Sequence, residues 1–341
     1  MKKVLITGRD GQLAWELGQT MPEGIELKSL GIEELDISDD SQVNKAMYSF
    51  NPDFVINTAD YTAVDKAESD KETAYAVNEK GCEYLAIACK KHKAKLIHVS
   101  TDFVFDGTKS TSYQPDDQTS PISVYGASKL AGEIKIGEIL GSEATIIRTA
   151  WLYSVNGSNF VKSMLRLMQE KEQLSIVYDQ VGTPTWAKGL AKVIWALLQS
   201  DSRQSTTDSR IFHWTDTGVA SWFDFAVAIQ ELATEKGMLK DEIPVYPIPT
   251  PAYTTPAKRP SFSITDKTLL EEICGIKAAH WRRQLSSMLD ELNSHCSSNV
   301  NRFNEVDKKK HELELTLVQE DLEKAIINNN FSLIKPIYKG E

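Results

Sequence analysis

The stretch KKVLITGRDGQLAWEL, residues 2–17, carries the strongest indication of the fold. An apolar run typical of a strand, residues 3–7, leads into a turn in which Gly8, Gly11 and Ala14 follow the pattern GxxGxxA. Such a turn lets the backbone approach a pyrophosphate, whose charge meets the free N–H groups at the start of the next helix. A glycine-rich turn without a ligand is the alternative, but the strand before it and the helix after it favour a dinucleotide.

The alternation of strand and helix continues along the first half of the chain. Strands are expected over residues 3–7, 25–30, 53–57, 95–100 and 145–148, and helices over residues 12–20, 41–50, 71–91 and 125–140. Strands separated by crossover helices indicate a parallel sheet with both faces covered. The predicted fold class is therefore α/β, a Rossmann-like doubly wound parallel sheet.

The pattern loosens after residue 153. Helices are expected over residues 160–171 and 186–199, a polar loop over 200–210, and a proline-rich stretch over 244–260. We expect three parts: an NAD(P)-binding Rossmann domain, a smaller mixed α/β substrate domain, some segments of which could return to the Rossmann domain, and an appended C-terminal tail. Their expected bounds are 1–150, 151–296 and 297–341.

Composition narrows the class of protein. Among 341 residues, 41% are hydrophobic, which allows a sizeable core, and 38 Lys and Arg stand against 48 Asp and Glu, which argues against a nucleic-acid partner. No run of 18 apolar residues predicts a membrane span, and the start is typical of a strand rather than a signal peptide. Four cysteines without a CxxC pair suit reduced thiols. These features predict a cytoplasmic protein.

A threonine, a tyrosine and a lysine are the candidate catalytic residues. Tyr125 and Lys129 are spaced i, i+4 on an expected helix, and Thr101 follows an expected strand, where open parallel sheets bind ligands. A phenol must shift its pKa by about three units, roughly 4 kcal/mol, to exchange a proton near pH 7, and an ammonium about 4 Å away supplies that energy. We therefore expect Lys129 to lower the pKa of Tyr125, which would protonate a ketone oxygen during hydride transfer. A solvated helix face is the alternative for an isolated YxxxK.

Residues near the second strand suggest where the adenine end of the dinucleotide lies. Asp36 and Ile37 could hold it, although Asp36 could equally be an acid at a helix start. Lys28 and Arg9 are close enough in sequence to meet a 2′-phosphate, which favours NADPH over NADH.

Longer strings resemble a known family. They are GRDGQLAWEL (8–17), YTAVDKAE (61–68), STDFVFDG (100–107), PISVYGASKLAGE (121–133), RTAWLY (148–153), NFVKSMLRL (159–167), DQVGTPT (179–185) and AKRPSFS (257–263). In order, across roughly residues 1–293, they resemble the dTDP-4-dehydrorhamnose reductase family of the extended short-chain dehydrogenase/reductases. The resemblance implies NAD(P)H-dependent reduction of the C4 ketone of dTDP-4-dehydro-L-rhamnose to dTDP-L-rhamnose, which supplies surface polysaccharides.

The resemblance also implies roles for single residues. Besides Gly8 of the turn, the positions matching the family's cofactor contacts are Gly11, Gln12, Leu13, Asp36, Ile37, Thr58, Ala59, Asp60, Tyr125 and Lys129. Those matching its sugar-nucleotide contacts are Thr62, Val64, Thr101, Phe103, Tyr125 and Trp151. Arg259, beside Lys258, is a candidate for the substrate diphosphate because a guanidinium fits phosphate oxygens, with a solvated charge as the alternative.

Two of these positions depart from the family pattern. Phe103 stands where the family usually has tyrosine, and Asp60 replaces a small residue. The Asp60 carboxylate could change the affinity for the cofactor or form a salt bridge with Lys66 or Arg9.

The resemblance leaves a metal ion and the assembly open. Some members carry Mg²⁺ at a dimer contact, for which Asp290 and Glu291 are weak candidates here, so a homodimer is compatible with the sequence. Two alternatives to a reductase stay open: a non-catalytic NADP-binding subunit resembling the methionine adenosyltransferase β subunit, and a nucleotide-sugar epimerase or dehydratase.

Overall fold

The computed structural model describes residues 1–199 and 210–299, with side chains up to residue 294. Residues 1–291 form one compact unit, and a second unit begins at Leu292. Most of the expected loop over 200–210 and of the expected tail over 297–341 lies outside the described residues.

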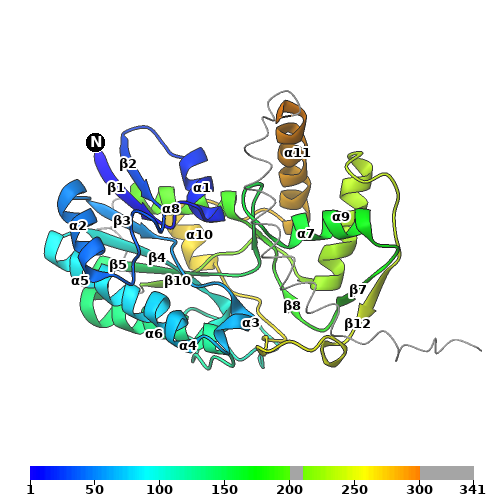
Figure 1. Ribbon diagram of the computed structural model, residues 1–341, viewed down its shortest axis with the longest axis horizontal. Helices are drawn as coiled ribbons and strands as arrows, with labels where there is room; N and C mark the ends of the chain where they lie inside the picture. Colours follow the sequence, from blue (N-terminus) through cyan, green and yellow to red (C-terminus); the bar gives the residue numbers. More distant parts are fainter. Residues whose placement is uncertain (200–209, 300–341) are drawn as a thin grey trace, which may run out of the picture. The chain divides into compact units, whose positions relative to one another are not determined.

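A six-stranded parallel sheet organises the first unit (Figure 1). Its order is β10-β5-β4-β3-β1-β2, formed by β1 (Lys2–Thr7), β2 (Ile25–Leu30), β3 (Phe54–Asn57), β4 (Lys95–Thr101), β5 (Ala144–Thr149) and β10 (Ile211–His213). The predicted fold class and its five strands are confirmed, and β10 from the second half of the chain extends the sheet beside β5. The order reverses at β1, where a doubly wound sheet opens a crevice for a ligand.

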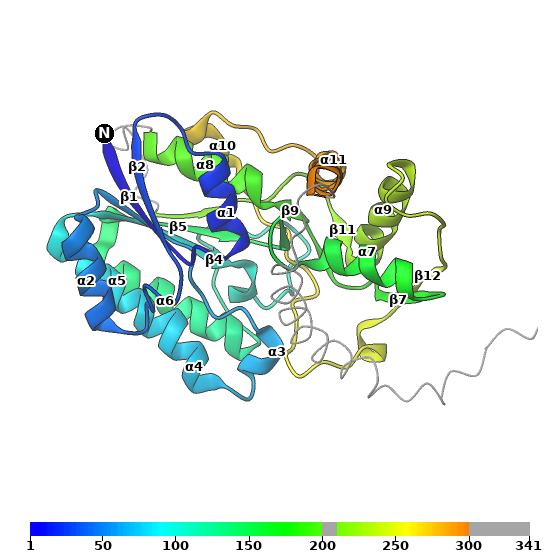
Figure 2. The ribbon, with the colours of Figure 1, turned by 45° about the horizontal axis from the view of Figure 1, so that its top comes forward.

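Helices cover both faces of this sheet (Figure 2). Successive side chains of a strand point to opposite faces of the sheet. On one face, Leu5 and Val55 pack with α2 (Asp40–Phe50), α5 (Cys82–His92) and α6 (Val124–Leu140). Ile6 and Ile56 pack on the opposite face with α1 (Gln12–Gln19), α8 (Ala187–Gln199) and α10 (Thr268–Cys274). Burial on both faces explains why a central strand such as β3, FVIN, reads as a continuous apolar run.

The expected helix over residues 71–91 contains a wider turn. It consists of α4 (Lys71–Tyr75), a π-helical segment (Ala76–Gly81) and α5. Close contact with α6 accompanies that turn, because a Cβ atom on Gly132 would lie 2.1 Å from the carbonyl oxygen of Asn78. Such π turns often occur near functional sites.

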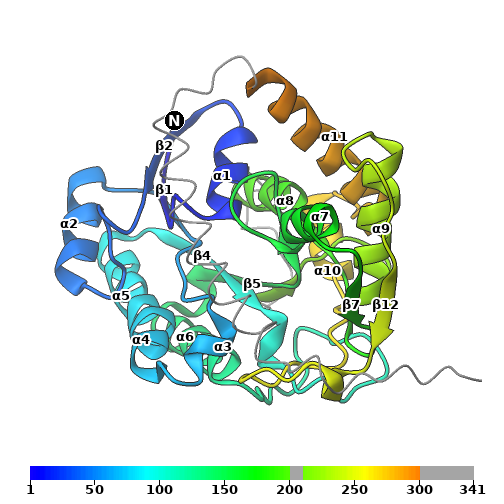
Figure 3. The same ribbon diagram turned by 45° about the vertical axis from the view of Figure 1, so that its right-hand side comes forward.

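The rest of the first unit is built from short elements. Helices α7 (Phe160–Glu170) and α9 (Trp222–Glu235) pack through Phe160 and Phe225, whose ring centroids lie 5.4 Å apart (Figure 3). Two-stranded sheets join β7 (Leu174–Val177) to β12 (Val245–Ile248), β8 (Val181–Gly182) to β11 (Ala220–Ser221), and β6 (Leu152–Tyr153) to β9 (Thr185–Trp186). Helices α3 (Val64–Ala67) and α11 (Trp281–Asn299) complete the α-helices described, with short 3₁₀ turns at Asp102–Val104, Gly141–Glu143 and Thr250–Ala252. No helix among residues 1–199 and 210–299 is long and apolar enough to cross a membrane.

Candidate active site

The glycine turn after β1 leaves its backbone uncovered by side chains at Gly8 and Gly11. Gly8 has φ +74°, and a Cβ atom placed on it would lie 2.8 Å from the backbone nitrogen of Ala59. Gly11 is the N-cap of α1 and has no side chain to occupy the first N–H groups of the helix. Open N–H groups at a helix start and a turn without side chains fit a dinucleotide pyrophosphate.

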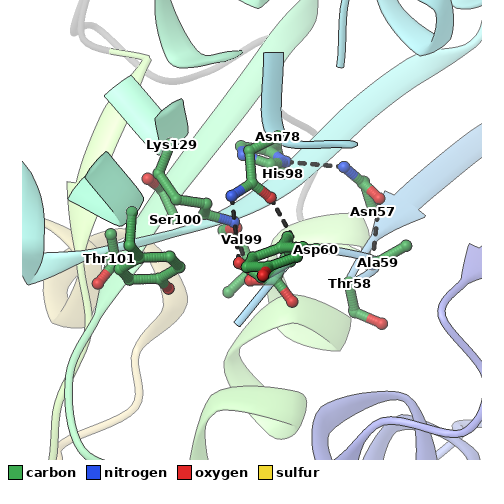
Figure 4. A network of polar contacts seen from close by, with 12 residues as sticks. Asn57, Thr58, Ala59, Asp60, Asn78, His98, Val99, Ser100, Thr101 and Lys129 are labelled. Carbon is green, nitrogen blue, oxygen red and sulfur yellow. Dashed lines mark hydrogen bonds and ion pairs between the residues drawn. The ribbon is translucent and has the colours of Figure 1, made fainter. Parts of the chain in front are cut away.

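The loop after β3 is held against this turn. The Thr7 hydroxyl donates to Asn57 Oδ1 at 2.6 Å, and the Thr58 hydroxyl donates to the Thr7 carbonyl oxygen at 2.7 Å. Three residues expected at the cofactor, Thr58, Ala59 and Asp60, therefore follow β3 beside the glycine turn. Figure 4 shows these three residues together.

Thr101 and Tyr125 are brought together where β4 ends and α6 begins. Ser123 caps α6 by accepting the Gly126 N–H at 3.2 Å. A Cβ atom on Gly126 would lie 2.2 Å from the Phe103 carbonyl oxygen, so the 3₁₀ turn Asp102–Val104 lies directly on the start of α6. As a result, the Thr101 hydroxyl lies close enough to the Tyr125 phenol to lower its pKa, and the Phe103 ring meets the tyrosine ring edge-on at 5.5 Å.

Lys129 lies one turn further along α6 and is buried, with 1% of its side chain exposed. Its ammonium donates to the Val99 carbonyl oxygen at 2.8 Å and to Asp60 Oδ2 at 3.1 Å (Figure 4). The two partners considered for Asp60 were wrong, because Lys66 pairs with Asp70 and Arg9 pairs with Glu34.

The expected effect of Lys129 on Tyr125 is not what the structure shows. Burial raises the pKa of Tyr125 above its ordinary value, the negative charges of Asp60 and then Asp102 raise it further, and the Thr101 hydrogen bond opposes them. The predicted lowering of this pKa was therefore wrong. Its physical reason is mainly the burial of the phenol, to which the charge of Asp60, beside the Lys129 ammonium, adds.

Asp102 is a site residue that the sequence analysis missed. It is 2% exposed and accepts the Thr101 hydroxyl at 3.1 Å. Burial raises its pKa to about 6, against hydrogen bonds from Ser263 and Thr101 that lower it. Its place directly after Thr101 in STDFVF was visible, but an aspartate gives no indication of its own burial.

Residues expected at the adenine end are engaged in local structure. Asp36 Oδ1 accepts the backbone N–H and hydroxyl of Ser38 at 2.9 and 2.7 Å, whereas Asp39, not Asp36, caps α2. The Ile37 side chain is buried beside Gly81.

Lys28 does not join Arg9 as expected. Its ammonium lies 5.6 Å from the centre of the Phe50 ring, at the last residue of α2. Arg9 does lie at the end of β2, since a Cβ atom on Gly31 would be 3.0 Å from its Nη2. Arg9 is thus the better placed of the two for a 2′-phosphate.

The first two residues of α1 face different surroundings. The Gln12 side-chain oxygen accepts from Asn159 Nδ2 at 2.9 Å, which ties α1 to the start of α7. Leu13 is buried in the core, so its backbone rather than its side chain is available to a ligand.

Trp151 and Trp222 form an aromatic pair. Their rings stack with centroids 3.6 Å apart, and Trp151 adopts φ +49°, a conformation that non-glycine residues rarely take. Gly182 makes room for this ring, because a Cβ atom there would lie 2.6 Å from Trp151 Cε2. A non-glycine residue held in this region is often found at a functional site.

The remaining substrate candidates lie along the edge of α3. Thr62 is exposed, and Val64 begins the helix. Arg259 is not a free charge: its Nη1 and Nη2 bind the Asp65 carboxylate at 3.0 and 2.6 Å, and Nη1 also donates to Thr255 at 2.6 Å.

The proposed metal ligands find no support. Asp290 binds Lys236 at 2.6 Å, and Glu291 binds Lys188. Among the described residues, no group of three His, Cys, Asp or Glu side chains could hold a metal ion.

Comparison with known proteins decides the family. Residues 1–294 match the family described as RmlD substrate binding domain. The chain belongs to this family. A dTDP-4-dehydrorhamnose reductase of Aggregatibacter actinomycetemcomitans is 39% identical over 290 residues, which cover 84% of this chain and 98% of that protein. The spore coat polysaccharide biosynthesis protein SpsK of Bacillus subtilis is 36% identical over 297 residues, 87% and 100% of the two chains.

Solved structures agree with this family assignment. A dTDP-4-dehydrorhamnose reductase from Clostridium acetobutylicum superposes with a TM-score of 0.78 at 37% identity, and one from Bacillus anthracis, in complex with NADP, with 0.78 at 34%. Each match covers 85% of this chain and 99% of the other. A UDP-glucose 4-epimerase from Thermus thermophilus, with a TM-score of 0.71 at 17% identity, shares the fold.

Proposed function

We propose that this protein is an NAD(P)H-dependent oxidoreductase that reduces the C4 ketone of dTDP-4-dehydro-L-rhamnose to dTDP-L-rhamnose. The observation that carries the proposal is the gathering of Thr101, Tyr125 and Lys129 at the crevice edge of the sheet, in a chain of this family. Relatives at 38–39% identity that bear the reductase name support it.

The side chains at this edge can supply the proton and the orientation. The cofactor, when bound, supplies the hydride. The Tyr125 phenol, which burial keeps protonated, donates its proton to the oxygen that gains charge. Thr101 presents its hydroxyl beside the phenol. The Lys129 ammonium, which donates to the Val99 carbonyl oxygen, lies next to the loop after β3 that carries Asp60. An ammonium there can hold a ribose hydroxyl.

We assign NADPH as the preferred cofactor. Support comes from the NADP complex of the Bacillus anthracis relative and from Arg9 at the end of β2. Arg9 is 45% exposed, so its guanidinium can leave Glu34 for a phosphate. Arg9→Ala should raise KM for NADPH while leaving KM for NADH nearly unchanged; equal KM changes for both cofactors contradict this assignment.

For the sugar nucleotide, we assign Thr62, Val64 and Phe103 from residues 1–150 and Trp151 from residues 151–296, so that both parts of the chain contribute to the sugar site, while residues 1–150 hold most of the cofactor site. The exposed edge of α3 and the strained, stacked Trp151 support these assignments. A cytoplasmic location and a homodimer stay predictions.

The test is direct assay of the purified protein. NADPH and enzymatically made dTDP-4-dehydro-L-rhamnose are mixed with it, reduced-nicotinamide absorbance is followed, and the product is identified by NMR. Stoichiometric NADPH loss and dTDP-L-rhamnose formation are expected. No NADPH consumption by folded protein overturns the proposal and favours the non-catalytic alternative, whereas tightly bound oxidised cofactor in the purified protein would favour an epimerase.

A further inference from the structure

Trp151 lies at the edge of the sheet where the reaction is proposed to occur. Thr149, the last residue of β5, pairs with Thr101 of β4, so Trp151 comes two residues after the position paired with Thr101. The Trp151 carbonyl oxygen accepts the Thr185 N–H at 3.1 Å, and β6 begins at the next residue, Leu152. The backbone is thus fixed on both sides of Trp151, as a residue held in a left-handed conformation requires.

One small sheet brings the two neighbours of the Trp151 ring together. Strand β8 contains Gly182, which leaves room for the edge of the indole, and β11 leads directly into Trp222, which stacks on the face of the indole at an interplanar angle of 7°. Gly182 pairs with Ala220 across these two strands. The same strand pairing therefore sets the position of the edge contact and of the stacked ring.

Trp222 is itself held in place at the start of α9. The Ser221 hydroxyl accepts the Asp224 N–H at 3.0 Å, and Asp224 Oδ2 accepts the Ser221 N–H at 2.8 Å. This capping box fixes the backbone of the first helical turn. The ring of Phe160, from α7, packs against the Trp222 ring with centroids 4.7 Å apart. Trp222 thus offers Trp151 a flat surface in a fixed position.

The tryptophan pair is not part of the closed core. Trp151 and Trp222 are both partly exposed, whereas Phe225, three residues further along α9, is 1% exposed. Because Trp222 covers one face of the Trp151 ring, a ligand can meet that ring only on its other face or at its edges. Tryptophans that are partly exposed in this way are typical of surfaces that contact a partner.

We propose that Trp222 is a positioning residue for the sugar nucleotide: by stacking on Trp151, it holds that indole in the orientation that the substrate meets beside Thr101. This inference rests on the proposed function and on its assignment of Trp151 to the sugar nucleotide. Without the stacked ring, the Trp151 side chain gains freedom that substrate binding must remove again. Affinity for the sugar nucleotide then falls, while the proton and hydride transfers, in which Trp222 takes no part, are preserved.

Steady-state kinetics of Trp222 variants test this role. Trp222→Leu removes the flat ring but keeps an apolar side chain, and it should raise KM for dTDP-4-dehydro-L-rhamnose about tenfold with kcat nearly unchanged. The dissociation constant of NADPH, measured by fluorescence, should stay at the wild-type value. Trp222→Phe restores a flat ring and should recover most of the affinity. Phe160→Leu is the matched control, because it removes another aromatic neighbour of Trp222 but leaves both stacked rings, and its KM should stay near that of the wild type.

A double-mutant cycle shows whether Trp222 acts through Trp151. Trp151→Ala removes the ring that the substrate is proposed to meet and should raise KM at least as much as W222L does. If Trp222 acts only through that ring, adding W222L to W151A changes KM no further. Calorimetric titration with dTDP-L-rhamnose repeats the cycle without turnover. Thermal unfolding shows that each variant is folded, and Trp222→Met takes the place of W222L if W222L does not fold.

The outcomes separate this inference from the proposed function. A folded wild type that consumes no NADPH removes the proposed function, whereas an active wild type with the same KM as W222L removes the role of Trp222. Equal rises of KM in W222L and F160L, or a further rise when W222L is added to W151A, also overturn it, because Trp222 then acts through general packing or by direct contact. An unchanged KM in W151A removes this inference together with the assignment of Trp151, but leaves the reductase activity in place.

Discussion

Two ion pairs lie one turn apart along α6, and they differ in how completely the protein encloses them. Glu133 and Arg148 are 2% and 3% exposed, with Nη2 to Oε2 at 2.7 Å and Nε to Oε1 at 3.0 Å. Ser100 donates to the same carboxylate, and Arg148 Nη1 donates to the Pro115 carbonyl oxygen at 3.2 Å. In contrast, Asp60, the partner of Lys129, is 24% exposed.

The difference separates a structural charge pair from one available to chemistry. Each group of the Glu133–Arg148 pair has its hydrogen bonds supplied by protein, and the guanidinium also lies 5.1 Å from the centre of the Phe105 ring. No face remains for a ligand. In the Lys129–Asp60 pair the ammonium is buried and the carboxylate is the exposed member, so a ligand at the crevice reaches the pair through Asp60.

Breaking the enclosed pair should have the largest effect. Glu133→Ala leaves the Arg148 charge buried without a counter-ion, and we expect a loss of about 3–5 kcal/mol in the free energy of unfolding. Urea unfolding measures it. Replacing both residues by methionine should recover most of the loss, because no charge is then left unpaired. A loss below about 1 kcal/mol in Glu133→Ala would contradict the enclosed character of the pair.

At the open pair, the expected loss is in rate rather than stability. Tyr125→Phe removes the proton donor beside Lys129 and should lower kcat by at least about 100-fold, roughly 2.7 kcal/mol. Cofactor binding, measured by NADPH fluorescence, and the melting temperature should change little. Tyr153→Phe, the same chemical change at another buried tyrosine, serves as the control. A nearly active Tyr125→Phe would show that the proton comes from another group.

The comparison extends to a buried carboxyl group, Asp216, that forms no ion pair within the part of the chain that the structure describes. Asp216 is 1% exposed, accepts the Trp186 N–H at 3.0 Å, and has its pKa raised to about 7 by burial. The carboxyl ionises near pH 4 in the unfolded chain but only near 7 in the folded one, so stability falls as pH rises through this window. We expect wild type to lose about 2 kcal/mol more than Asp216→Asn between about pH 5 and 8. Urea unfolding at both pH values measures this, and parallel losses would show that Asp216 ionises alike in both states.

The sequence predicted the parts of the site that depend on strand ends and helical spacing. Gly8, Thr58 and Thr101 lie at the ends of parallel strands, which share one edge of the sheet by construction, and Tyr125 and Lys129 share a face of α6. The side chains that surround these residues depend on which groups become buried together. Neither the strand ends nor the helical spacing specifies that.

Side-chain pairing is therefore where the sequence predictions failed. Asp60 was expected either to change the affinity for the cofactor or to form a salt bridge with Lys66 or Arg9, but it pairs with Lys129. Asn78, in a π turn that periodicity does not reveal, hydrogen-bonds both the loop that carries Asp60 and the helix that carries Lys129. The short strands and α9 of the second half were likewise missed, because two-residue strands carry no alternation.

The smallest expected effect is at a third pair, which is more open still. Arg259 and Asp65 are 24% and 39% exposed, and exposed pairs contribute little to stability. If the guanidinium serves the substrate diphosphate, Arg259→Ala should raise KM for the dTDP-sugar about tenfold, roughly 1.4 kcal/mol, with kcat unchanged. Asp65→Asn releases the guanidinium from its competitor and should lower KM instead. Opposite signs of the two KM changes would assign Arg259 to the substrate. If the ion pair only holds the proline-rich loop against α3, both variants weaken it and KM rises in both.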